Sequence, residues 1–167
     1  MHASQVYRKY LMWGLYALLF LAVLLIQEIP LGRQRFFGAK LNLMPMTVVL
    51  ITMHLGHEVG GLFGLLAGCF WCMSGADDGS AAILTWTVLS IAAGYLCDVV
   101  FPRRFLPALV LSLAALLFHG GIVFLLNVLL TGAPWSLGLQ TLISAGLSLL
   151  ACPVLYFLCR AIGKVVG

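Results

Sequence analysis

Long apolar runs separated by short polar segments make up most of the chain. One run covers residues 10–29. As a helix that rises about 1.5 Å per residue it would be about 30 Å long, the thickness of the hydrocarbon core of a bilayer. Comparable runs cover residues 81–101, 106–130 and 137–162. The pattern therefore predicts four full-length transmembrane helices.

Two shorter apolar runs lie between the first and second of these helices. They cover residues 41–55 and 60–73, and each would be only about 21 to 23 Å long as a straight helix. Two interpretations remain open: short spans in a locally thinned bilayer, or a re-entrant pair buried in protein. Both return the chain to the same side, so the predicted fold is an all-α bundle of about six transmembrane helices.

Composition agrees with a membrane environment. Of the 167 residues, 63% are hydrophobic and 8% are charged, whereas about a quarter of the residues of a soluble domain are charged. Six spans and their connections use the whole length, so we expect one integral membrane domain over residues 1–167, surrounded by the lipid bilayer. The net charge of +4 is dispersed along the sequence, which argues against a nucleic-acid partner.

The basic residues predict the orientation of the bundle. With six spans, six of the nine Lys and Arg residues lie on the side that holds both termini, and three lie on the opposite side. The six are Arg8, Lys9, Arg103, Arg104, Arg160 and Lys164, and the three are Arg33, Arg35 and Lys40. Cytoplasmic loops of membrane proteins carry an excess of Lys and Arg. We therefore expect both termini in the cytoplasm.

Small residues at steps of four form a strip in the run 60–73 and just before it. The strip consists of Gly56, Gly60, Gly64 and Gly68, and Cys72 continues it. In lipid, helices associate through close contact, and a face without side chains lets a partner backbone approach. The strip is a candidate partner-binding face. Packing against a neighbouring helix of the same chain is an equal alternative.

A second row with the same spacing lies in the last apolar run. It contains Gln140, Ser144, Ser148 and Cys152, which are polar or small and are able to hydrogen-bond across a helix interface. Packing within the bundle is the preferred interpretation of this row. Pro153 follows it and predicts a kink in the helix.

His119 lies near the middle of the run 106–130. An ionisable group at this depth is a functional candidate by default. No second acid or base is expected at the membrane centre, which argues against a proton relay. The preferred interpretation is a neutral imidazole that hydrogen-bonds Gln140 or Asn127.

Other polar groups do not form a recognisable catalytic or metal site. His54, His57 and Glu58 lack the His-Glu-x-x-His spacing and a third protein ligand, so we interpret them as a short interfacial turn. Asp98 with the pair Arg103–Arg104 is interpreted as an interfacial charge cluster. We therefore predict no catalytic residue, no metal and no cofactor.

Cys69 and Cys72 form a C-x-x-C pair near the outer end of the run 60–73. A quinone-linked thiol oxidoreductase would place such a pair there, but it would also need a second pair in an outer loop. Cys97, Cys152 and Cys159 fall toward the inner side. The redox function is therefore kept only as a minor alternative.

Five segments, in chain order, resemble the rod shape-determining protein MreD family, small bacterial membrane proteins of the cell-elongation machinery. They are residues 25–30 (LIQEIP), 37–43 (FGAKLNL), 60–68 with Ser74-Gly75, 93–96 (AGYL) with Arg103-Arg104, and 151–160 (ACPVLYFLCR). The resemblance covers nearly the whole chain. The chain differs from the family at Cys72 and at His119-Gly120, because members of the family commonly carry acidic residues at these places.

The resemblance implies a non-catalytic scaffold for peptidoglycan synthesis in the bacterial inner membrane. It implies binding to the single-span protein MreC and support of RodA and its class B penicillin-binding protein. It also implies a fold similar to the vitamin-binding S-components of energy-coupling-factor transporters, which is the main alternative function. Those subunits dock through Ala-x-x-x-Ala on the first helix, whereas here Leu21 follows Ala17 and Ile26 follows Ala22.

Overall fold

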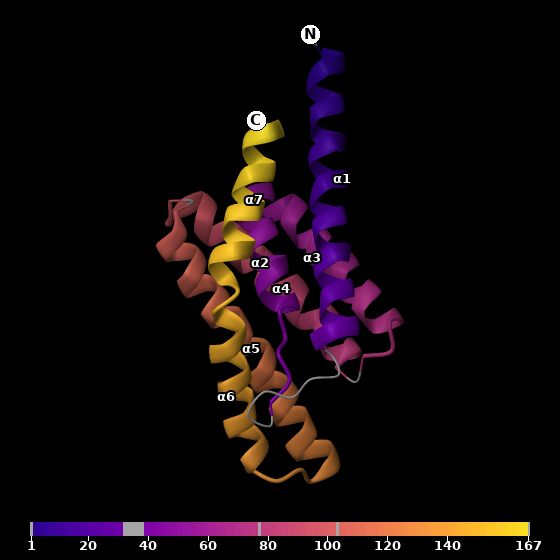
Figure 1. The fold of residues 1–167 in the computed structure, drawn as a ribbon, viewed down its shortest axis with the longest axis vertical. Coiled ribbons are helices and arrows are strands. Elements are labelled where there is room, and N and C mark those ends of the chain that lie inside the picture. Colours follow the sequence, from indigo (N-terminus) through magenta and orange to yellow (C-terminus); the bar gives the residue numbers. More distant parts are fainter. Residues whose placement is uncertain (1, 32–38, 77, 103, 167) are drawn as a thin grey trace.

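The computed structural model describes residues 2–31, 39–76, 78–102 and 104–166, and every regular element in these ranges is a helix. This confirms the all-α prediction for these residues. The elements are α1 (His2–Ile26), a short π-helical turn η1 (Gln27–Leu31), α2 (Met44–Leu55), α3 (His57–Met73), α4 (Gly79–Val99), α5 (Phe105–Thr131), α6 (Ser136–Leu149) and α7 (Cys152–Val166). Figure 1 shows both termini at one end of the bundle.

Three of the described helical stretches are long and apolar enough to cross a membrane. They are Tyr10–Ile29, α4 and α5. The pair α6 and α7 is bent by 47°, and it supplies a fourth candidate if the two helices form one broken span. The bend confirms the kink predicted at Pro153. Helices α2 and α3 are also apolar but have only 12 and 17 residues, fewer than any of these stretches.

Helix α2 forms the centre of the molecule. All ten residues from Met44 to Met53 are buried, and α2 packs against α1, α3, α4, α5 and α7. A helix that is apolar on every side is stable only when other elements surround it completely. Of the two interpretations of this region, burial in protein therefore suits α2 better than a short span exposed to lipid.

The boundaries of α2 and α3 differ from the predicted runs 41–55 and 60–73. Helix α2 begins at Met44, because residues 39–43 are not helical and Pro45 occupies its first turn, where a missing N–H costs nothing. Helix α3 begins at His57 directly after Gly56, whose φ of 84° breaks the chain direction. Such a φ favours glycine.

The glycine strip of α3 is filled by the chain's own helices. A Cβ at Gly64 would lie 2.7 Å from the backbone oxygen of Trp86, and one at Gly68 would lie 2.7 Å from Ile83 Cα. Gly60 packs on α2 in the same way. The partner-binding interpretation of these glycines is therefore wrong, because α4 and α2 already occupy the face. Packing within the chain, the alternative, accounts for the spacing.

The two ends of the strip follow the same pattern. At one end, Gly56 faces the carboxylate of Asp98 in α4. At the other, Cys72 packs on Gly79 at the start of α4, although its side chain is exposed. Gly94 of α4 packs just as closely on the start of α3, because a Cβ at Gly94 would lie 2.5 Å from His57 Cα. Helices α3 and α4 thus form a closely packed pair.

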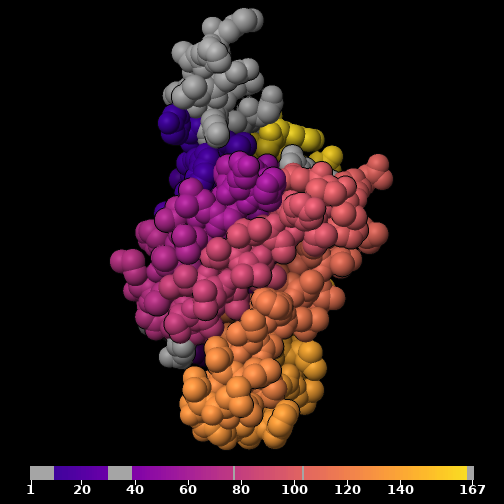
Figure 2. All heavy atoms as spheres, turned by 180° about the vertical axis from the view of Figure 1, so that it is seen from behind, coloured from indigo at the N-terminus to yellow at the C-terminus, as the bar shows by residue number. Residues whose placement is uncertain are grey.

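The second half of α5 and the whole of α6 extend away from the termini. Figure 1 shows this hairpin at the end opposite to N and C, and Figure 2 shows it, in orange, projecting beyond the α3–α4 pair. Helix α4 begins only at Gly79, beside the middle of α5, where His119 lies. This stagger leaves one side of the hairpin open to the end of α1 and to residues 39–43.

Candidate functional site

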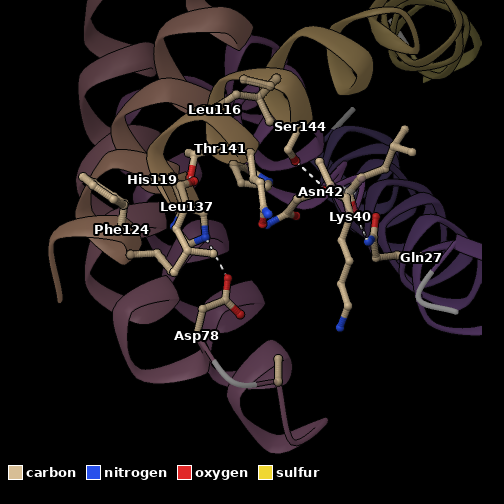
Figure 3. A pocket seen from close by; sticks show the side chains of 18 of the residues that line it. Gln27, Lys40, Asn42, Asp78, Leu116, His119, Phe124, Leu137, Thr141 and Ser144 are labelled. Carbon is tan, nitrogen blue, oxygen red and sulfur yellow. Dashed lines mark hydrogen bonds and ion pairs between the residues drawn. The ribbon is translucent and has the colours of Figure 1, made fainter. Parts of the chain in front are cut away.

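A cavity of about 610 Å³ lies where the α5–α6 hairpin faces the rest of the chain. Its walls come from the end of α1 and η1, from residues 39–43, from the α3–α4 connection, and from α5 and α6. Figure 3 shows Phe124, Leu137 and His119 on one side and Asn42, Lys40 and Gln27 on the other. We call residues 39–43 the strap, because this non-helical segment runs along the wall of the cavity between α1 and α6.

One edge of the strap is held by Gln27, which is only 6% exposed. Its side-chain nitrogen donates to the backbone oxygen of Leu41, and its side-chain oxygen accepts from the backbone N–H of Leu43 at 3.0 Å. One amide group thus satisfies two backbone groups of the strap, which is not part of a helix. A buried backbone group left unpaired would cost about 1–3 kcal/mol.

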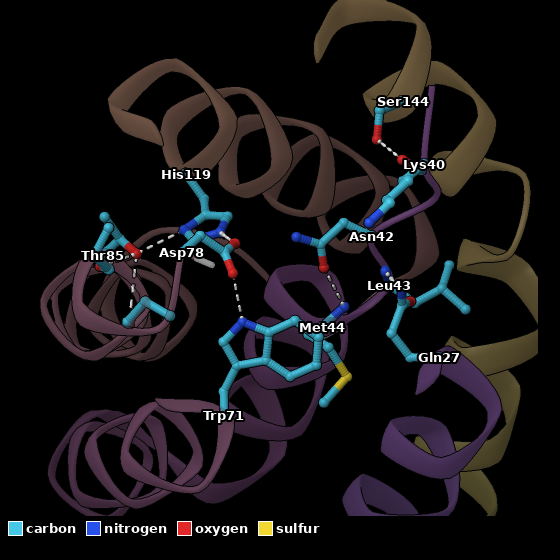
Figure 4. Close-up of polar contacts among 12 residues, drawn as sticks. Gln27, Lys40, Asn42, Leu43, Met44, Trp71, Asp78, Thr85, His119 and Ser144 are labelled. Carbon is cyan, nitrogen blue, oxygen red and sulfur yellow. Dashed lines mark hydrogen bonds and ion pairs between the residues drawn. The ribbon is translucent and has the colours of Figure 1, made fainter. Parts of the chain in front are cut away.

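The other edge of the strap is held by α6. The hydroxyl of Ser148 accepts from the backbone N–H of Asn42 at 3.0 Å, and the hydroxyl of Ser144 donates to the backbone oxygen of Lys40. The Asn42 side-chain oxygen accepts from the N–H of Met44 at 3.2 Å, at the first residue of α2. Figure 4 shows the remaining side-chain nitrogen of Asn42 pointing toward Asp78 and His119.

These contacts explain most of the polar row on the last apolar run. The row was expected to hydrogen-bond across a helix interface, but Ser144 and Ser148 bind the strap instead. Cys152 does reach another helix, with its Sγ 3.7 Å from the hydroxyl of Ser112 in α5. Gln140 lines the cavity.

His119 belongs to a buried polar network that joins α3, α4 and α5. The residue is 2% exposed. Nε2 lies 3.0 Å from Asp78 Oδ2, and Nδ1 lies 2.7 Å from the hydroxyl of Thr85. The other carboxylate oxygen of Asp78 accepts from the indole N–H of Trp71 at 2.8 Å. Figure 4 shows the four side chains in one continuous chain.

The partners predicted for His119 are therefore wrong. Neither Gln140 nor Asn127 bonds to it; an acid does, and that acid is Asp78. In the sequence, Asp78 belongs to an acidic, turn-forming segment between two apolar runs. In the structure this turn folds against the middle of α5, because α4 starts at that level.

The charge state of Asp78 follows from its contacts. Burial raises its pKa, but the hydrogen bonds from His119 and Trp71 lower it, and the net pKa lies below the ordinary value of 3.8. The carboxylate is thus ionised at neutral pH. The Thr85 hydroxyl donates to the oxygen of Ala81 at 2.8 Å, so both ring nitrogens of His119 face acceptors.

Several polar groups face the cavity unpaired. Among the described residues, the side chains of Asn127 and Gln140 have no hydrogen-bond partner, although both line the cavity. The exposed side chains of Glu28 and Lys40 add one charge of each sign to its wall. The cavity therefore offers amide donors and acceptors within a lining of nearly balanced charge.

The other polar clusters do not line the cavity, and their side chains bond to other groups. His57 Nδ1 lies 2.9 Å from Asp98 Oδ2, and His54 Nδ1 bonds the oxygen of Leu50 within α2. Asp98 was expected beside Arg103 and Arg104; Arg103 lies outside the described residues. Within the described ranges, no three His, Cys, Asp or Glu side chains come close enough together to hold a metal ion.

The five cysteines are free thiols. Cys69 is partly exposed and Cys72 is exposed, whereas Cys97, Cys152 and Cys159 are buried. The C-x-x-C pair at the end of α3 therefore has no partner pair on the surface of the described chain. This arrangement gives the thiol-oxidoreductase alternative no further support.

Sequence reasoning did not single out Gln27, Asn42, Asp78 or Trp71. The missed signals were present: Gln27 is a polar side chain inside a predicted span, where it must find a partner. Asn42 precedes a helix with Pro45 in its first turn, a position that favours a capping side chain. Neither signal, however, names the partner.

Comparison of the chain with protein-family models, with curated proteins and with solved structures found no significant match.

Proposed function

We propose that this protein is a non-catalytic membrane scaffold of the MreD type in the bacterial cell-elongation machinery. In this role it binds a single-span MreC-like protein in the membrane and supports RodA and its class B penicillin-binding protein. We place it in the bacterial inner membrane with both termini in the cytoplasm, an orientation supported by the six basic residues on that side against three on the other.

The observation that carries the proposal is the place of the MreD-like segments in the fold. Each described one lies where elements join. Gln27, directly after α1, binds the strap, and Asn42 of the strap accepts from the N–H of Met44, the first residue of α2. The glycine-rich segment packs on α4, and Gly94 packs on the start of α3. The segment around Pro153 forms the bend between α6 and α7. A sequence likeness confined to apolar composition would not be expected to coincide with these joints.

The partner helix must then contact an exposed helix face, because the glycine strip is occupied. One such face runs along α1 into η1, where Leu18, Leu21, Leu25 and Ile29 recur at steps of three or four and are each at least 43% exposed. Residues at this spacing share one side of a helix. In lipid, this face offers contact without any loss of bundle packing.

Co-purification tests the scaffold function. The chain is expressed with a tagged MreC-like protein from the same genome, extracted in mild detergent and recovered through the tag. We expect recovery of both proteins, and photo-crosslinks to the partner from Leu18 or Leu25. A crosslinker at Leu129 of α5, which is 70% exposed, serves as the comparison. The absence of any complex, together with failure to restore rod shape in a strain that lacks its own MreD, would contradict the proposal.

The cavity favours a second candidate, a vitamin-binding transporter subunit. Its volume of about 610 Å³ suits a small molecule, which a scaffold does not need. Mass spectrometry of the denatured protein after purification tests this function: a stoichiometric vitamin would favour it over the scaffold. Neighbouring genes provide an independent check, since ATPase genes would favour transport and a gene for an actin-like protein would favour the scaffold.

A further inference from the structure

We propose that the cavity between the strap and the α5–α6 hairpin binds an uncharged, planar small molecule that carries ring amide or carboxamide groups. The proposal goes beyond the scaffold function and does not depend on it. It also names the ligand class that the transporter alternative would require.

The cavity has the size and the fixed walls of a binding site. Its volume of about 610 Å³ lies within the range of about 300–1,000 Å³ that is usual for small-molecule sites. Gln27 holds one edge of the strap, and Ser144 and Ser148 hold the other. The Asp78–His119 pair fixes the third side. A ligand would therefore meet walls that are already ordered, which lowers the cost of binding.

Two open amides and one open amide nitrogen define the polar chemistry of the ligand. The amides belong to Asn127 on α5 and Gln140 on α6, and the nitrogen belongs to Asn42 on the strap, so these groups reach the cavity from three separate segments. A primary amide both donates and accepts hydrogen bonds. Its reciprocal partner is another amide, such as a ring lactam, an imide or a carboxamide. A ligand with such groups satisfies polar atoms that otherwise have only water.

The charges of the lining favour a neutral ligand. The Asp78 carboxylate is paired with His119 and Trp71, so it is not free to bind a cation. Glu28 and Lys40 oppose each other in sign. The described lining contains no arginine, the residue that most often binds phosphate or carboxylate through two hydrogen bonds. Among the described lining residues, an anionic ligand would therefore find only Lys40 as a basic side chain that is not opposed by a carboxylate bonded to it.

The apolar wall favours a flat molecule. Phe124 of α5 and Leu137 of α6 lie on the side opposite to the strap (Figure 3), and Leu116 of α5 also lines the cavity. A planar ring presents an apolar face to such a wall, and aromatic rings stack in offset or edge-to-face contact with a phenyl ring. The edge of the same ring carries the amide groups toward Asn42. Both walls are then used at once.

Equilibrium dialysis of the full chain in lipid nanodiscs tests this proposal. The neutral probes are quinazoline-2,4-dione, 2-quinolinone and quinoline-3-carboxamide; the comparison molecules are 2-naphthoate, which is anionic, and naphthalene, which lacks amides. Empty nanodiscs correct for partition into lipid. We expect saturable binding of at least one neutral probe and none of 2-naphthoate or naphthalene. Failure of all three neutral probes, or equal binding of 2-naphthoate, would overturn the proposal.

Variants locate the binding in the cavity. Asn127→Leu combined with Gln140→Leu removes both open amides, and we expect at least a tenfold loss of affinity for the bound probe. Both side chains are exposed, so the double variant should elute from size exclusion like the wild type. Thr131→Val, one turn beyond Asn127 and outside the lining, is the matched control and should bind normally. Unchanged affinity in the double variant would refute the site. Co-purification of the double variant with the MreC-like protein should be unaffected, and this second measurement tests the scaffold function separately.

Discussion

Replacing Gly68 by alanine should force α3 and α4 apart. The new Cβ would lie 2.7 Å from Ile83 Cα, whereas ordinary contact begins at 3.4 Å. The two helices must therefore separate locally by about 0.7 Å, and backbone atoms cannot avoid the clash by changing rotamer. Overpacking of this kind costs about 1–3 kcal/mol of the free energy of unfolding.

Gly146→Ala is the matched control for this change. Gly146 also lies inside a helix, and nothing lies within 4 Å of the position of its Cβ. Alanine stabilises a helix relative to glycine by about 1 kcal/mol at both sites. The difference between the two variants therefore isolates the clash, and we expect Gly68→Ala to be the less stable by about 1–3 kcal/mol.

Unfolding by SDS in mixed micelles, followed by far-UV circular dichroism, measures this difference. The reasoning requires a lower SDS midpoint for Gly68→Ala than for Gly146→Ala. Equal midpoints would show that the strip of α3 is not packed against α4 as described. If equal midpoints were accompanied by loss of the MreC-like partner in Gly68→Ala alone, the strip would be a docking face after all.

Two further changes probe the walls of the cavity. Gln27→Leu leaves the backbone groups of Leu41 and Leu43 without their partner and should lower the free energy of unfolding by about 1–3 kcal/mol; wild-type stability in the SDS titration would contradict the clamp. Asp78→Asn should lower the thermal midpoint at pH 7. Because the native pKa of Asp78 lies below its unfolded value of 3.8, its carboxylate stabilises the fold above that value, and the contribution is lost as the pH falls through the native pKa. The gap between wild type and Asp78→Asn, measured by fluorescence-detected melting from pH 7 to pH 3, should therefore narrow in acid; a gap that stays constant would refute this role.

The sequence predicted the long helices well and the short ones less well. Helix α5 follows the apolar run 106–130 closely, because hydrophobic length alone decides such an element. The start of α2 depends instead on Gln27, which binds the backbone of Leu41 and Leu43 directly before the helix. That contact joins distant parts of the chain, and no local pattern contains it.

The site was less predictable than the fold. Spacing of glycines showed that a backbone approaches α3, but the same spacing fits a foreign helix or α4 equally well. His119 was recognised as unusual, whereas its acid was missed because Asp78 is 41 residues away and lies in an acidic, turn-forming segment. Whether that segment lies beside the middle of α5 depends on where α4 begins relative to α5, and the sequence does not contain this relative position.

The enclosed position of α2 constrains the order in which the protein is assembled. Synthesis delivers α2 before α4, α5 and α7, yet these later helices form much of its surroundings. Twelve residues are too few to be retained by lipid as an independent span. The surroundings of α2 are therefore incomplete until α7 has been synthesised. Helix α7 thus completes the burial of α2, and a chain interrupted before α7 would leave α2 exposed to degradation by membrane proteases.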